Sequence, residues 1–264
     1  MRKIVFFDID GTLVDDATQA IAESTPGAIA ALRRQGHLAV LNTGRPYLHI
    51  DPRVLSWQWD GWVCACGMQV WAEGKRLHAA APSLEVCCRT RDLARACGLD
   101  VIYETEQGFV KDGPWGEISR REVNRLEARG REVLYDPCFP EFRFLKLVTF
   151  DHGNADQVRF RREAERDFFI IDRGDGMLEL TLRGNTKSTG ISILLDYFGL
   201  SRSDAFAFGD STNDLTMFGC VGTGVAMGGS PEALVREAAF VTDTTLADGI
   251  RNGLVQLGLI PGKF

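Results

Sequence analysis

Two aspartates one residue apart, Asp8 and Asp10, directly follow a short apolar run, Ile4 to Phe7. The run is typical of a buried strand, and open α/β sheets bind ligands at the carboxyl ends of their strands. Residues two apart on an extended backbone point the same way, so both carboxylates could face one small site. Carboxylates that lie so close together repel each other unless a cation or a shared proton compensates. Among cations, Mg²⁺ prefers hard oxygen ligands of this kind. An acidic turn explains the same residues, because Asp-Gly is also ordinary turn chemistry.

A second acidic pair, Asp210 and Asp214, follows another apolar run, Ala205 to Phe208. The spacing places one acid just before a predicted helix and the other in its first turn, where helix capping alone would also favour Asp. Lys187 opens a further predicted helix, although a cation there opposes the helix macrodipole. A solvated lysine could occupy the same position. These acids and this lysine are therefore candidate site residues with a structural alternative at each position.

The elements that must position these residues predict an α/β fold with a doubly wound parallel sheet as its core. A helix beginning near Ser24 and ending near Gly36 connects the first strand to a second one over 37–42, and this βαβ unit should be right-handed. The alternation stops near residue 80 and resumes near 184. We therefore expect a core domain formed by 1–80 and 184–264.

The intervening segment, 81–183, mixes strands and helices and predicts an inserted α+β domain. Within it, the alternating residues 142–150 predict a strand with one solvated face. In the returning core, the pattern predicts a final helix over 246–257.

Composition excludes several classes of function. The 264 residues are 45% hydrophobic and carry a net charge of −6, so we expect no nucleic-acid partner. No run of about twenty apolar residues predicts a membrane span. Met1 to Lys3 lead straight into the first strand, which leaves no room for a signal peptide. The seven cysteines have irregular spacing, so we expect a cytoplasmic protein whose cysteines are buried free thiols rather than metal ligands.

Together, the motifs resemble those of haloacid dehalogenase (HAD) superfamily phosphatases, in the Cof-type branch (subfamily IIB) with a C2-type cap. The four matching motifs, in chain order, are Asp8 to Leu13, Thr43-Gly44-Arg45, Lys187 and Gly209 to Asp214. One departure lies at Cys66-Gly67-Met68, where the branch commonly has Asn-Gly-Ala. The resemblance covers the predicted core and implies that the segment 81–183 is the cap.

The resemblance implies Mg²⁺-dependent hydrolysis of a phosphate monoester through an aspartyl-phosphate. Asp8 would be the nucleophile, and Asp10 would protonate the leaving alkoxide and then deprotonate water. Mg²⁺ would be held by Asp8, the backbone carbonyl of Asp10 and Asp210, and Asp214 would orient the water shell of the metal.

The remaining motif residues would bind the phosphoryl group. Lys187 would contact both Asp8 and the phosphoryl oxygens. The other expected phosphate contacts are the Thr43 hydroxyl and the N–H groups of Gly44, Ile9 and Asp10. Asn213 would either contact the phosphate or help to position Asp214. Arg45 would meet the far side of the substrate at the cap boundary, with a surface ion pair as its alternative.

The expected partner is a small phosphate ester, such as a sugar phosphate or a phosphorylated cofactor. A phosphomutase or phosphotransferase would use the same core, and a non-catalytic binding module is the remaining alternative. The sequence identifies neither the substrate, nor the cap residues that select it, nor the oligomeric state, nor the effect of Cys66.

Overall fold

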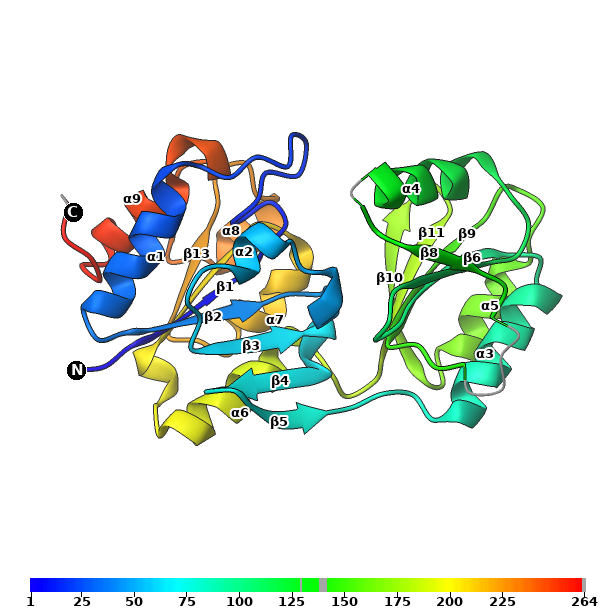
Figure 1. Ribbon diagram of the computed structural model, residues 1–264, viewed down its shortest axis with the longest axis horizontal. Coiled ribbons are helices and arrows are strands. Elements are labelled where there is room, and N and C mark those ends of the chain that lie inside the picture. The colour runs from blue at the N-terminus through cyan, green and yellow to red at the C-terminus, as the bar shows by residue number, and fades with distance from the viewer. Residues whose placement is uncertain (129, 138–141, 263–264) are drawn as a thin grey trace. The chain divides into compact units, whose positions relative to one another are not determined.

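The computed structural model describes residues 1–128, 130–137 and 142–262. The chain divides into two compact units (Figure 1). Unit 1 comprises Met1–Arg45, Ile50–Ala79 and Thr186–Phe264, and unit 2 comprises Pro46–His49 and Ala80–Asn185. The sequence analysis predicted domain boundaries at 80/81 and 183/184, and it did not predict that 46–49 group with unit 2. The roles of the units as core and cap domains stay predictions.

Unit 1 is built on one sheet whose strand order is β14-β13-β12-β1-β2-β3-β4-β5. The strands are β1 (Ile4–Phe7), β2 (Leu38–Asn42), β3 (Gly61–Cys64), β4 (Gln69–Ala72), β5 (Lys75–Ala79), β12 (Ala205–Gly209), β13 (Thr223–Ala226) and β14 (Phe240–Val241). All pairings are parallel except those of β4 with its two neighbours. The predicted doubly wound parallel sheet is therefore confirmed, with an antiparallel hairpin added at one edge.

Helices cover both faces of this sheet, which explains why its parallel strands are apolar throughout. One face packs against α6 (Lys187–Phe198), α7 (Leu215–Phe218) and α8 (Glu232–Glu237). On the other face, α1 (Ser24–Arg34) lies beside α9 (Gly249–Gln256), as Figure 1 shows, and the short α2 (Pro52–Leu55) precedes β3. The helix predicted over 246–257 is wrong at its start, because Asp248 adopts a left-handed φ of 63° and separates a 3₁₀ turn, η5 (Thr245–Ala247), from α9.

Unit 2 has a sheet with strand order β10-β11-β9-β6-β7-β8, in which only β7 and β8 pair in parallel. These strands are β6 (Asp100–Glu104), β7 (Phe109–Asp112), β8 (Val133–Tyr135), β9 (Lys146–Phe150), β10 (Phe168–Gly174) and β11 (Met177–Leu182). Helices α3 (Leu84–Ala96) and α5 (Gln157–Ala164) share one core cluster, and α4 (Glu117–Ala128) contributes to another. Side chains alternate between the two clusters along β6, so the helices cover opposite faces.

The strand predicted over 142–150 is wrong in two respects. It begins only at Lys146, and it has no solvated face, because Leu147 packs in one core cluster of unit 2 and Phe150 in the other. Lys146 itself is buried, and its ammonium lies 2.6 Å from a carboxylate oxygen of Glu179. The polar position in the alternating pattern is therefore a buried lysine, whose charge is balanced by an ion pair inside the unit and not by exposure to solvent.

The six described cysteines are free thiols, as predicted, but Cys88 and Cys220 are only partly buried. Cys138 lies outside the described residues. Within the described ranges, no helix combines the length and the apolar character that crossing a membrane requires.

Candidate active site

The site begins at the carboxyl edge of unit 1, where the adjacent strands β12, β1 and β2 end. Asp8 immediately follows β1, and its backbone N–H donates to the Phe208 carbonyl of β12 at 3.1 Å. This bond continues the strand pairing past the end of β1 and fixes the backbone of Asp8. Only 4% of Asp8 is exposed. Because the sheet is doubly wound, the strand ends around β1 are the place where a ligand crevice is expected.

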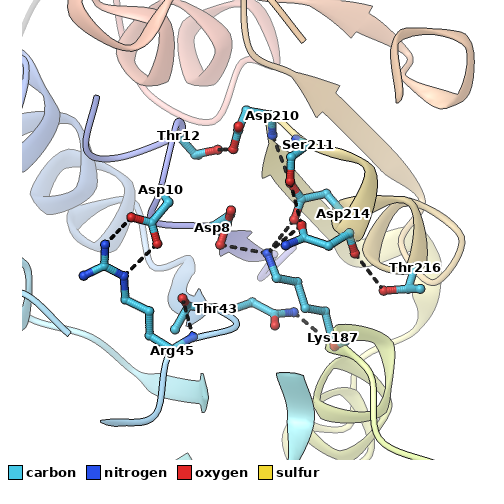
Figure 2. Close-up of polar contacts among 12 residues, drawn as sticks. Asp8, Asp10, Thr12, Thr43, Arg45, Lys187, Asp210, Ser211, Asp214 and Thr216 are labelled. Atoms are coloured by element: carbon cyan, nitrogen blue, oxygen red, sulfur yellow. Dashed lines mark hydrogen bonds and ion pairs between the residues drawn. The ribbon is translucent and has the colours of Figure 1, made fainter. Parts of the chain in front are cut away.

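Lys187 is the first residue of α6 and brings its ammonium to the buried carboxylates (Figure 2). The nitrogen Nζ lies 2.7 Å from Oδ1 of Asp8 and 2.6 Å from Oδ1 of Asp214, and it donates a longer bond of 3.4 Å to Asn213. Lys187 is 2% exposed. Burial alone would lower the pKa of its ammonium, but the charges of Asp214 and Asp8 more than offset burial and raise that pKa. Lys187 is therefore a fixed positive charge.

Asp214 is fully buried and is held by donors on both of its carboxylate oxygens. Its Oδ2 accepts the backbone N–H groups of Asp210 and Ser211, each at 3.0 Å, while Oδ1 contacts Lys187. Asp214 ends the 3₁₀ turn η4 (Thr212–Asp214), which Ser211 caps, so the predicted position in the first helical turn is confirmed. Because both oxygens already have partners, Asp214 is suited to orient its neighbours.

Asp210 follows β12, and its Oδ1 accepts the Thr12 hydroxyl at 3.0 Å. Carboxylate oxygens of Asp8, Asp210 and Asp214 all lie within 4.8 Å of one another. Burial raises the pKa of Asp210 to about 7, with a further contribution from Asp214. Burial also raises the pKa of Asp8 well above its ordinary value, and Lys187 only partly opposes this. A buried group of oxygen ligands with excess negative charge fits a hard divalent cation such as Mg²⁺.

Position 11 requires glycine because a side chain there would collide with Asp210. Its φ is 73°, which L-residues with a side chain rarely adopt, and a Cβ added there would lie 2.1 Å from Oδ2 of Asp210. The Gly11 carbonyl accepts the Thr245 hydroxyl at 2.5 Å, which connects η5 to the loop after β1. The glycine of the first motif therefore leaves space for a carboxylate that is distant in the sequence.

The Asp10 carboxylate does not join the buried group around Lys187. Both of its oxygens bind the Arg45 guanidinium, with 2.7 Å between Nε and Oδ2, and Asp10 is partly exposed. Thr43 follows β2 and is buried, and its hydroxyl oxygen accepts the Arg45 backbone N–H at 3.1 Å. Figure 2 shows Asp10, Arg45, Thr43 and Lys187 arranged around Asp8. Ile9 lies in the loop after β1, and Gly44 lies in the loop after β2. The phosphate contacts expected of both residues use their backbone N–H groups.

Two supporting residues were missed by the sequence analysis. Asn42, the last residue of β2, donates from Nδ2 to the Lys187 carbonyl at 3.1 Å. A polar residue that ends an apolar strand beside Thr43 was the available signal. The other is Thr245, whose bond to Gly11 spans most of the chain and has no signal in the sequence.

The loop that departs from the resemblance, Ala65 to Gly67, lies against the same site. All three residues have positive φ values, including 54° at Cys66. The Cys66 backbone N–H donates to the Thr43 carbonyl at 3.2 Å, and a Cβ on Gly67 would lie 2.1 Å from the Thr186 carbonyl. The turn therefore packs between the Thr43 loop and the start of α6.

A family model, related sequences and solved structures match most of this chain. A family model described as haloacid dehalogenase-like hydrolase matches residues 5–254. A Streptococcus pyogenes serotype M6 protein, provisionally named a bifunctional phosphatase/peptidyl-prolyl cis-trans isomerase, is 27% identical over 98% of this chain and 54% of its own length. The chain thus spans about half of that relative.

Two further relatives match over nearly their whole length. The Bacillus subtilis (strain 168) 5-amino-6-(5-phospho-D-ribitylamino)uracil phosphatase YitU is 25% identical over 94% of each chain. Among solved structures, a sugar phosphatase of HAD subclass IIB superposes with a TM-score of 0.81 at 26% identity, covering 98% of this chain and 100% of that one.

Proposed function

The chain belongs to the haloacid dehalogenase-like hydrolase family and is a phosphoric monoester hydrolase, and we propose that it works through an aspartyl-phosphate formed on Asp8 with the help of Mg²⁺. The observation that carries the proposal is the Lys187 ammonium, which lies within 2.7 Å of Asp8 and of Asp214 in a buried group of carboxylates. An anionic nucleophile can approach an anionic phosphate only where fixed positive charge offsets their repulsion.

Asp8 would attack phosphorus with a carboxylate oxygen, and the bond from phosphorus to the leaving alkoxide would break. The Thr43 hydroxyl and the backbone N–H groups of Gly44 and Ile9 would bind phosphoryl oxygens, and Lys187 would contact both Asp8 and the phosphoryl group. Asn213, which accepts a bond from Lys187, would help to hold the phosphoryl oxygens.

Asp10 would donate a proton to the leaving alkoxide and later accept one from the water that hydrolyses the intermediate. Both of its oxygens are bonded to Arg45 here, so this role requires Arg45 to release at least one of them. Arg45 would then be available to the substrate. The Asp10–Arg45 pair is therefore a resting arrangement in this proposal.

Mg²⁺ would be held by Asp8, Asp210 and the Asp10 backbone carbonyl, with Asp214 as an orienting neighbour, and it would supply positive charge to the phosphoryl oxygens. Two observations indicate that the site fits Mg²⁺. All the ligand atoms are oxygens, and the raised pKa values of Asp8 and Asp210 indicate an excess of negative charge that a cation would balance.

The test is phosphate release from p-nitrophenyl phosphate by the wild type and by Asp8→Asn, with Mg²⁺, with Ca²⁺ and in EDTA. We expect turnover only by the wild type with Mg²⁺, because an amide is neither an adequate nucleophile nor an anionic ligand, and Ca²⁺ prefers more and longer bonds. Hydroxylamine should trap the acyl-phosphate in Asp10→Asn but not in Asp8→Asn. Turnover by Asp8→Asn close to that of the wild type would exclude the mechanism.

We further propose that the substrate is a sugar phosphate or a phosphorylated cofactor and that unit 2 selects it. The motif residues act on the phosphoryl group, which all phosphate monoesters share, so discrimination needs other residues. A panel of phosphorylated metabolites would be compared for the full chain and for a folded variant lacking 81–183. The deletion should spare p-nitrophenyl phosphate hydrolysis more than that of the best metabolite, and unchanged relative rates would contradict the proposal.

A further inference from the structure

Asn42 connects two segments of the site that are 145 residues apart. It is the last residue of β2, immediately before Thr43, and it is 0% exposed. Its Nδ2 donates to the backbone carbonyl of Lys187 at 3.1 Å. The end of β2 is thereby bonded to the first residue of α6.

This bond adds to the helix without being needed to form it. The carbonyl of the first residue in an α-helix accepts the N–H four residues later, and a carbonyl oxygen has a second lone pair. Thr186, which precedes Lys187, already donates its N–H to the Thr189 hydroxyl at 3.1 Å. Removing the Asn42 donor would leave those bonds in place, so its effect should fall on the position of the helix start rather than on helix formation.

The other end of the Asn42 amide indicates that stability does not explain the residue. Within the described part of the chain, its buried Oδ1 has no hydrogen-bond partner. A buried acceptor without a partner carries a desolvation cost, which an apolar side chain of similar size would avoid. We therefore expect that an asparagine occupies this position because its Nδ2 donor serves a purpose other than stability.

That purpose follows from the geometry of Lys187. Its ammonium must lie within bonding distance of both Asp8 and Asp214 at the end of a flexible four-carbon stem. Fixing the backbone from which the stem starts restricts where the ammonium can go, and supporting hydrogen bonds of this kind hold functional groups in place.

We propose that Asn42 is a positioning residue that holds the Lys187 ammonium between Asp8 and Asp214. This inference rests on the proposed function, in which Lys187 contacts the nucleophile and the phosphoryl group. Asn42 itself touches neither.

The test compares Asn42→Leu with the wild type and with Thr242→Val. The control removes another buried hydrogen bond from a side chain to a carbonyl in unit 1, that of Thr242 to Gly249 at 2.8 Å, neither of which is a proposed catalytic or phosphate-binding residue. We expect Asn42→Leu to unfold at the same or a higher urea concentration than the wild type. Its kcat for p-nitrophenyl phosphate should fall about tenfold, equivalent to about 1.4 kcal/mol, with little change in KM. Thr242→Val should lose stability and keep kcat.

A second measurement does not depend on turnover. The ¹H–¹⁵N signal of the Lys187 ammonium, assigned by its loss in Lys187→Met, should be sharp in the wild type and in Thr242→Val but broadened in Asn42→Leu. An unchanged signal and kcat, or a loss of stability that accounts for the loss of kcat, would overturn the proposal. If Asn42→Leu does not fold, Asn42→Ala replaces it. A wild type without phosphatase activity would refute the proposed function, while the signal would still test the positioning.

Discussion

Lys187→Met is the substitution whose effect the structure defines most sharply. Methionine approximates the apolar stem of lysine, and the side chain is 2% exposed, so the main change is loss of the ammonium between Asp8 and Asp214. Removing one partner of a buried ion pair costs about 3–5 kcal/mol, because the remaining charge stays buried without compensation. We expect a loss of this size in the free energy of unfolding at pH 8 in EDTA, together with loss of turnover.

The pH dependence has a definite sign. The folded-state pKa values of Asp8 and Asp210 lie above their ordinary values, so the folded protein binds more protons than the unfolded chain. Their contribution therefore destabilises the fold as the pH rises through the folded pKa, which is about 7 for Asp210. Lys187 lowers both pKa values, so its removal raises them further. The loss in Lys187→Met should accordingly be larger at pH 8 than at pH 5.

The assay is urea unfolding followed by tryptophan fluorescence, which mainly reports unit 1 because that unit contains four of the five tryptophans, Trp57, Trp59, Trp62 and Trp71. The matched control is Lys111→Met, followed by circular dichroism. Lys111 is equally buried in unit 2, and its ammonium lies 2.6 Å from Asp100.

The control should respond differently to pH. Burial would raise the pKa of Asp100, but bonds from Lys111, Ser119 and other donors lower it below the ordinary value. In the wild type, Asp100 is therefore ionised at both pH 5 and pH 8, and Ser119, Gly116 and His152 still contact it in Lys111→Met. The loss in the control should therefore change less with pH than the loss in Lys187→Met. Equal losses at the two pH values in Lys187→Met, or retained turnover, would refute this account of the site.

Two further predictions follow from particular contacts. Gly11→Ala should raise the Mg²⁺ concentration needed for half-maximal activity, because its Cβ would displace Asp210. Gly36 has a φ of 84°, and a Cβ there would meet no atom within 4 Å apart from its chain neighbours, so Gly36→Ala should only lose stability by about 1–2 kcal/mol. Equal Mg²⁺ titrations for both variants would contradict this. In unit 2, burial raises the pKa of Glu179, but Lys146 and a neighbouring arginine lower it to about 2. Glu179 should therefore contribute about 3 kcal/mol that is present above its ordinary pKa and is lost as the pH falls from about 4.5 to 2; a stability difference between the wild type and Glu179→Gln that stays constant over this range would contradict it.

The phosphatase chemistry, and the edge of the sheet where we expect it, could be predicted without a structure. Asp8 and Asp210 each follow an apolar strand, and strand ends in a parallel sheet meet at one edge. The family resemblance was needed to assign these two carboxylates to one metal site. The order of motifs along the chain was equally available without a structure, and so was the family resemblance.

The bonds between individual side chains could be seen only in the folded protein. No local pattern connects Asn42 with Lys187 or pairs Asp10 with Arg45. Nor does a local pattern show that a Cβ on Gly11 would lie 2.1 Å from Asp210. It also predicted a solvated face on β9, whose Lys146 is buried and paired with Glu179. The cause is the same in each case. Periodicity and turn residues describe local backbone, whereas these contacts depend on strand order, on the packing of α6 against the sheet and on covering helices, which bring together residues far apart in the chain.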